Sequence, residues 1–170
     1  EMRLNLWRPP TQNDRADPNG AAAWDGLERL KVKESKAQVS SAEKCKEADG
    51  FVFGSPVHYA SATGSISSFM DRLFYSTFTN PELFRLKPAA SVVSARRAGT
   101  TVTYDQFPPS FGLTPLPILS SRSWNMVHGA TPDDVREDEE GMQIMRILGK
   151  NMAYYLKCQE AGRKAGIAMP

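Results

Sequence analysis

The sequence contains little cysteine and little net charge. Cys45 and Cys158 are the two cysteines among 170 residues, and they are too far apart to form a CxxC redox motif or a zinc-binding pair. Two unaccompanied cysteines are typical of a reduced, cytoplasmic protein. The formal net charge is +2 at pH 7 with both signs interspersed, so the composition predicts no nucleic-acid partner and no attraction to an anionic membrane.

Long apolar runs are also missing. No stretch approaches the roughly 20 apolar residues that a membrane span needs. The first residues, EMRLNLWRPP, lack a basic region followed by an apolar region, so we expect no signal peptide there. Hydrophobic residues make up 41% and charged residues 24% of the chain, a balance typical of a soluble globular protein. A chain of 170 residues fits one domain, which we expect to span residues 1–170.

The chain alternates short apolar runs with helical patterns. The runs MRLNLW, GFVFGSP, KPAASVVSA and LPILSS predict strands, and the second and third have the composition of strands buried on both faces. Helical patterns cover residues 21–32, 40–48 and 66–74; another helix begins at Thr131, and a long final helix runs to about Gly162. Buried strands that alternate with helices predict an α/β fold, in which helices cover both faces of a parallel sheet.

Three unusual loops follow predicted strands, namely Ser55–Gly64, Ser94–Gln106 and Ser120–Gly129. The first of them places small and hydroxylated residues around His58 and Tyr59. In open parallel sheets, ligands bind beyond the carboxyl ends of the strands, near the point where the strand order reverses. The sequence therefore predicts a ligand site where the loops meet. The alternative for the first loop is a plain strand-to-helix connection, whose small residues allow tight packing.

The chain resembles the NAD(P)H-dependent FMN reductase family of flavodoxin-like proteins in three segments: ADGFVFGSPVHYASATGSISSFMDRLF, KPAASVVSARRAGTTVTYDQ and WNMVHGATPDDVREDEEGMQIMRILGKNMAYYLKC. The resemblance covers about Ala48 to Ile167. It implies a three-layer flavodoxin-like fold with about five parallel strands in the order 2-1-3-4-5. It also implies non-covalent FMN, NAD(P)H as co-substrate, a homodimer or homotetramer, and hydride transfer to a flavin, quinone or similar small acceptor.

The same resemblance implies two walls for the flavin ring. The loop after GFVFGSP would contact the edge of the ring through backbone N–H groups and through the apolar sides of Val57 and Tyr59. The loop after KPAASVVSA would form the second wall. Arg96 and Arg97 would lie near the pyrimidine side or near the nicotinamide phosphate; alternatively, they are solvated charges. The implied cofactor-binding residues are Ser55, Pro56, Val57, His58, Tyr59, Ala60, Gly64, Ser94, Ala95, Arg96, Arg97, Gly99 and Trp124.

His58 and Tyr59 are the candidate catalytic residues. The alternative for His58 is an exposed or hydrogen-bonded structural residue. The sequence predicts no metal site, because two isolated cysteines cannot supply the four thiolates of the iron–sulfur cluster that some members of the family carry.

Residues 1–47 depart from the family pattern. The segment RPPTQNDRADPNGAAAW stands where the family binds the FMN phosphate, and Pro9 and Pro10 remove N–H donors that such a loop uses. Two alternatives to an NAD(P)H-dependent enzyme therefore stay open. One is an FMN-binding electron carrier, and the other is a non-catalytic flavodoxin-like module.

Overall fold

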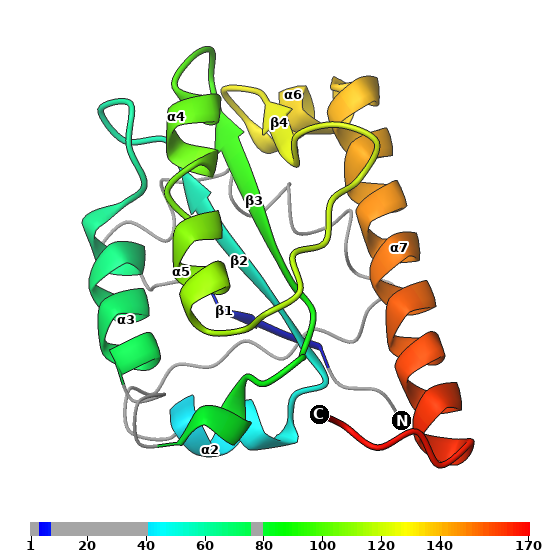
Figure 1. Ribbon diagram of the computed structural model, residues 1–170. Helices are drawn as coiled ribbons and strands as arrows, with labels where there is room; N and C mark the ends of the chain where they lie inside the picture. Colours follow the sequence, from blue (N-terminus) through cyan, green and yellow to red (C-terminus); the bar gives the residue numbers. More distant parts are fainter. Residues whose placement is uncertain (1–3, 8–40, 76–79) are drawn as a thin grey trace.

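The computed structural model describes residues 4–7, 41–75 and 80–170. Within these residues, four parallel strands form one sheet in the order β1-β2-β3-β4 (Figure 1). The strands are β1 (Leu4–Trp7), β2 (Gly50–Pro56), β3 (Ala89–Ala95) and β4 (Met126–His128).

The register places the carboxyl ends of three strands at one level. Pro56 of β2 pairs with Ser94 of β3, and Ser94 pairs with Val127 of β4. The ladder continues beyond the strands, because Val57 N donates to Ser94 O at 2.9 Å and Gly129 N donates to Ala95 O at 3.0 Å. The loops that follow β2, β3 and β4 therefore leave the sheet side by side, at its upper end in Figure 1.

Helices cover both faces of the sheet. Strand β2 shows the alternation, since Phe51 and Phe53 belong to one apolar core and Val52 to the other. The first core is closed by α3 (Gly64–Tyr75), the 3-10 helix η2 (Pro81–Leu83), α4 (Thr100–Tyr104) and α5 (Pro108–Leu113), with α2 (Ser41–Glu47) at its lower end. The second core lies against α6 (Pro132–Glu137) and α7 (Glu139–Lys164). Such a three-layer arrangement is the α/β fold that the sequence predicts.

An aromatic cluster fills the first core. The Phe53 ring lies 5.3 Å from Phe111 of α5 and 5.6 Å from Phe74 of α3, measured between ring centroids. Phe111 and Phe107 are 0% and 1% exposed. Burying one such ring contributes about 1.5–3 kcal/mol, which exceeds the small propensity terms of a six-residue helix. Packing of these rings therefore holds α5 in place, and its two leading prolines fit the first turn, where an N–H has no partner within the helix.

The fourth strand differs from the prediction. We expect a strand at LPILSS, but within that segment only Ile118 forms a bridge, to Ala89, and the strand lies at Met126–His128. Pro115 and Pro117 explain the difference, because proline has no N–H to donate to a ladder. The predicted five-strand order 2-1-3-4-5 stays a prediction, because the sheet of the described residues has four strands. The helix expected at residues 21–32 lies outside the described residues.

Two helical regions also differ from what the sequence predicts. Residues 94–106 are expected as a loop, yet α4 occupies Thr100–Tyr104. Its sequence TTVTY is rich in β-branched residues, which have low helix propensity, and tertiary packing overrides this. The helical region after Thr131 is divided at Asp138, which ends α6 and caps α7. No helix in the described part of the chain is long and apolar enough to cross a membrane.

Candidate functional site

The loop after β2 contains a strained tight turn. His58 N donates to Ser61 O at 2.9 Å, and Ser61 N donates to His58 O at 3.0 Å. The two residues between them, Tyr59 and Ala60, have φ angles of 49° and 58°. Two consecutive positive φ values define a type I′ turn, which favours Asn-Gly, and each non-glycine residue there costs about 1–2 kcal/mol. Strain of this kind is concentrated at ligand-binding sites.

Hydrogen bonds fix both ends of this loop. Ser55 Oγ donates to Pro56 O at 2.7 Å and accepts from Thr63 N at 3.0 Å, so both hydrogen bonds of the Ser55 side chain are made to backbone groups of the same loop. Thr63 Oγ1 accepts from Ile66 N at 3.3 Å and caps α3. These hydrogen bonds fix the backbone that leads into α3. The His58 and Tyr59 side chains are exposed at the tip of the loop.

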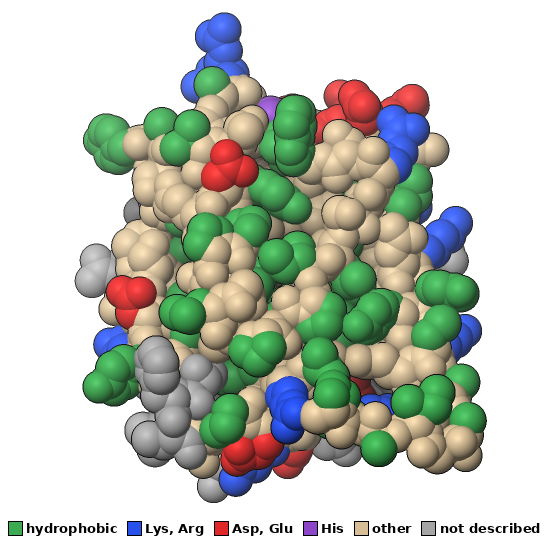
Figure 2. Space-filling view, in the orientation of Figure 1, with side chains coloured by type: hydrophobic (Ala, Val, Ile, Leu, Met, Phe, Trp, Pro, Cys, Tyr) green, Lys and Arg blue, Asp and Glu red, His purple; other side chains and the backbone are tan. Residues whose placement is uncertain are grey.

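The loop after β3 packs directly against this turn. Gly99 has φ +90°, and a Cβ on it would lie 2.8 Å from Val57 Cγ1 and 3.0 Å from Ala60 Cα. Only glycine therefore allows the two loops to approach so closely. Arg96 and Arg97 of the same loop are exposed. Figure 2 shows Lys or Arg side chains projecting from the upper end of the molecule, where Figure 1 places this loop.

The loop after β4 is fixed by two carboxylates. Asp138 Oδ2 accepts from His128 N at 2.7 Å, and Asp138 Oδ1 accepts from Gly141 N at 2.9 Å, so one side chain joins the end of β4 to the start of α7. Asp134 Oδ2 accepts from Ala130 N and from Thr131 N, each at 2.9 Å. Hydrogen bonds to side chains therefore hold the loop after β4, as they hold the loop after β2.

The environment of Asp134 favours its charged form. The hydrogen bond from the Ala130 N–H, with those from the Thr131 hydroxyl and N–H, lowers the pKa of Asp134, and the charge of Arg96 adds to this.

Acidification should weaken the start of α6. Because the pKa of Asp134 is lower in the folded chain, its carboxylate stabilises the fold at neutral pH, and this contribution is lost as the pH falls below the unfolded value of about 3.9. We expect Asp134→Asn to melt below wild type at pH 7 and the two melting temperatures to converge toward pH 2.5. Parallel curves would contradict this assignment. Asp133→Asn, which changes a surface carboxylate paired with Arg136, is the control.

Two buried hydroxyls at this end of the sheet have no partner. Ser94 Oγ, at the carboxyl end of β3, and Thr103 Oγ1, on α4, are buried without a hydrogen bond in the structure. An unpaired buried hydroxyl costs about 1–3 kcal/mol. The close loop contact at Gly99 and the unpaired Ser94 hydroxyl lie at the carboxyl edge of the sheet, and they suit a ligand with polar edges, as a flavin ring is.

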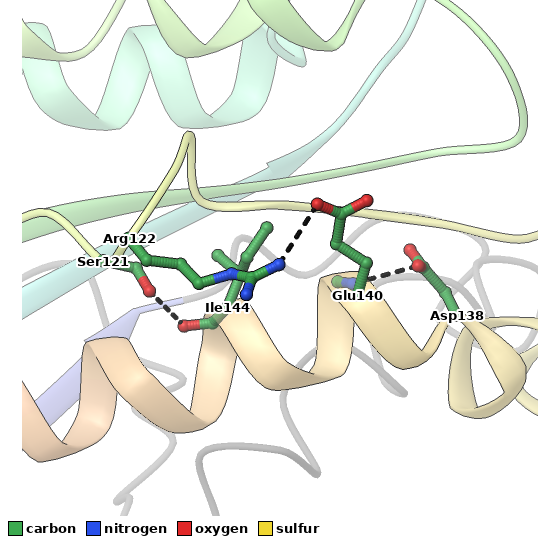
Figure 3. A network of polar contacts seen from close by, with 6 residues as sticks. Ser121, Arg122, Asp138, Glu140 and Ile144 are labelled. Carbon is green, nitrogen blue, oxygen red and sulfur yellow. Dashed lines mark hydrogen bonds and ion pairs between the residues drawn. The ribbon is translucent and has the colours of Figure 1, made fainter.

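The segment around Trp124 differs from the expected loop. Residues 120–129 are expected as a loop after a strand, but Trp124 precedes β4, and its carbonyl accepts from Met126 N at 2.9 Å. Its side chain is 58% exposed. The neighbouring Asn125 is fully buried and donates to Ser91 O at 3.0 Å, so it fixes this segment against β3. Figure 3 shows the adjoining contact, in which Ser121 Oγ donates to Ile144 O of α7 at 2.7 Å.

A cavity of about 600 Å³ lies away from these loops. It opens between the carboxyl-terminal half of α3, η2 and α5, and its lining is mostly apolar. The lining residues are Met70, Asp71, Phe74, Tyr75, Pro81, Phe84, Ser110, Leu113, Thr114 and Pro115. None of them is among the cofactor-binding residues that the sequence predicts.

The two thiols lie in different environments. Burial raises the pKa of Cys45 to about 11, with Lys87 opposing the shift, while Cys158 is exposed on α7. Among the described residues, no three histidine, cysteine or acidic side chains are arranged to hold a metal ion. Two cysteines in the sequence also remain too few for an iron–sulfur cluster.

The parallel sheet with helices on both faces, and with loops that meet at its carboxyl edge, is that of a flavodoxin-like α/β protein. A family model described as NADPH-dependent FMN reductase matches residues 25–131, more than half of the chain, and the chain belongs to this family. This result confirms the family that the three sequence segments indicate.

Individual proteins are similar to this chain in sequence or in fold. An iron–sulfur flavoprotein of Methanocaldococcus jannaschii is 27% identical over 120 residues, which are 68% of this chain and 62% of the relative's length. The WrbA-like flavodoxin of Agrobacterium tumefaciens superposes with a TM-score of 0.70 at 13% identity, over 93% of this chain and 99% of that one. The Trp repressor binding protein of Bacillus subtilis gives 0.69 at 13% identity, over 86% and 97%. At these identities the two solved structures establish the fold alone.

Proposed function

We propose that the protein is an FMN-dependent oxidoreductase that takes hydride from NAD(P)H and passes it to a flavin, quinone or similar small acceptor. The observation that carries the proposal is the contact between the strained turn at Tyr59–Ala60 and Gly99, at the carboxyl edge of the sheet of an FMN reductase family member. A turn with this conformation presents backbone groups and an aromatic side chain to a ligand at the position where open sheets bind cofactors.

The chain's own residues would bind and orient the cofactor. FMN, when bound, supplies the redox chemistry, and the protein supplies position and electrostatics. Residues 57–61 and 96–99 would line the ring, and Ser94 Oγ would gain the hydrogen-bond partner that it lacks. The exposed Arg96 and Arg97 would favour the negative charge of the reduced ring or of a dinucleotide phosphate. His58 and Tyr59, exposed at the tip, would contact the co-substrate. As the family resemblance implies, we propose a homodimer or homotetramer in the cytoplasm.

The visible absorbance spectrum of the full chain tests this function. After incubation with FMN and removal of unbound cofactor, we expect a flavin spectrum that bleaches when NADPH or NADH is added without oxygen. Reoxidation by an added quinone should restore the spectrum. A flavin spectrum that both nucleotides leave unchanged would contradict the enzyme and favour an electron carrier. No retained flavin would contradict both and leave the non-catalytic module.

A further inference from the structure

Gln106 joins the first two loops of the site through its side chain. It lies just after α4, and its Oε1 accepts from Ser61 Oγ at 3.1 Å and from Ala62 N at 3.2 Å. Its Nε2 donates to Val102 O at 3.2 Å, one turn back in the chain. One amide group therefore connects the turn after β2 to the helix that follows β3, across 44 positions of sequence.

The turn that Gln106 contacts needs support from outside. Tyr59 and Ala60 both have positive φ, and neither residue is a glycine or an asparagine, which adopt this conformation readily. Strained backbone of this kind persists only where its surroundings fix it. Ser61 closes the turn through its backbone bonds with His58. Gln106 Oε1 accepts from Ser61 Oγ and from Ala62 N, so the Gln106 side chain holds the end of the turn in place.

We propose that Gln106 is a positioning residue that keeps the Tyr59–Ala60 turn in its left-handed conformation and thereby holds the flavin-binding edge. Gln106 acts through the turn and touches no reacting atom. The cofactor part of the inference rests on the proposed function, whereas the mechanical part concerns the chain alone. Both parts predict that the turn becomes more mobile when the amide is lost.

Limited proteolysis tests the mechanical part without any cofactor. Tyr59 is fully exposed at the tip of the turn, so chymotrypsin can cleave after it once the turn opens. We expect Gln106→Met, which keeps the side-chain length but removes the amide, to speed cleavage after Tyr59 about ten-fold, the effect of losing one or two ordinary hydrogen bonds. Mass spectrometry follows this bond, with cleavage after the exposed Tyr154 of α7 as the internal reference.

FMN titration of the same variants tests the cofactor part. We expect Gln106→Met to raise the FMN dissociation constant about ten-fold. Gln106→Glu, which retains acceptor oxygens for Ser61 and Ala62, should recover most of both losses. Ser61→Ala, which removes one of the two bonds to Oε1, should show a smaller effect of the same sign. Gln159→Ala is the matched control, because Gln159 Nε2 donates to the Leu86 carbonyl in another part of the fold.

The two parts can fail separately. Unchanged cleavage after Tyr59 in Gln106→Met would overturn the positioning role, whatever the FMN result. If Gln106→Met is cleaved faster but the wild-type chain binds no FMN, the mechanical role is supported and the proposed function is rejected. Faster cleavage with an unchanged FMN dissociation constant would overturn the cofactor part, because the turn would then not hold the flavin edge.

Discussion

Gly99→Ala is expected to weaken FMN binding by about 100-fold. Two effects combine, because the residue has φ +90° and because its Cβ would lie 2.8 Å from Val57 Cγ1 and 3.0 Å from the Ala60 backbone. The φ angle alone costs about 1–2 kcal/mol, and the contact with backbone cannot be relieved by turning a side chain. The loop after β3 or the Tyr59–Ala60 turn must therefore move, and the two walls of the site separate.

Fluorescence titration with FMN measures this effect, and Gly112→Ala provides the control. Gly112 lies in α5, and a Cβ there meets no atom within 4 Å. We expect the control to bind FMN like wild type and to gain up to about 1 kcal/mol of stability, because alanine favours a helix over glycine. If Gly99→Ala binds FMN with wild-type affinity, the loops do not form the site together.

Asp138→Ala is expected to lower the free energy of unfolding by about 2–4 kcal/mol. The side chain is 21% exposed and accepts two backbone hydrogen bonds, from His128 N at 2.7 Å and from Gly141 N at 2.9 Å. Its loss removes the cap of α7 and leaves the His128 N–H at the end of β4 unpaired. Asp138→Asn keeps one acceptor oxygen, so it should fall between the alanine variant and wild type.

Urea unfolding measures this loss, with Glu140→Ala as the control. Figure 3 shows Glu140 near Asp138, reaching toward Arg122 at an N–O distance of 3.3 Å. The Arg122 and Glu140 side chains are 47% and 73% exposed, and such surface pairs contribute about 0–1 kcal/mol. Equal losses in Asp138→Ala and Glu140→Ala would show that Asp138 does not join β4 to α7.

Much of the central sheet could be predicted because its signals are local. Strands β2 and β3 and helix α3 lie where the apolar runs and the helical pattern place them. Strand β4 was not predicted, because a strand of three residues carries no periodic signal. Its pairing partners, Val93 and Ala95, are also distant from it in the sequence. Helices α4 and α5 are held by buried Thr103 and by Phe111, so their sequences alone do not predict them.

The loops of the candidate site stand out in the sequence, but the residues that support them do not. The loops after β2 and β3 are distinguished by their composition, and the structure brings Val57, Ala60 and Gly99 together. The roles of Gln106 and Asp138 come from bonds to residues 44 and 10 positions away, respectively, which no local pattern reveals. A glutamine after a threonine-rich segment has no distinct signature, whereas Asp138 before two glutamates has the form of a helix cap.

Hydrogen–deuterium exchange with and without FMN tests the proposed site most directly. If the flavin lies at the carboxyl edge of the sheet, FMN slows exchange in residues 57–63 and 96–99, with a smaller effect after β4. The cavity between α3, η2 and α5 is the internal comparison, and residues 70–75 and 110–115 should exchange as before. Protection of those cavity residues, with the strand-end loops unchanged, would contradict the assignment of the flavin site.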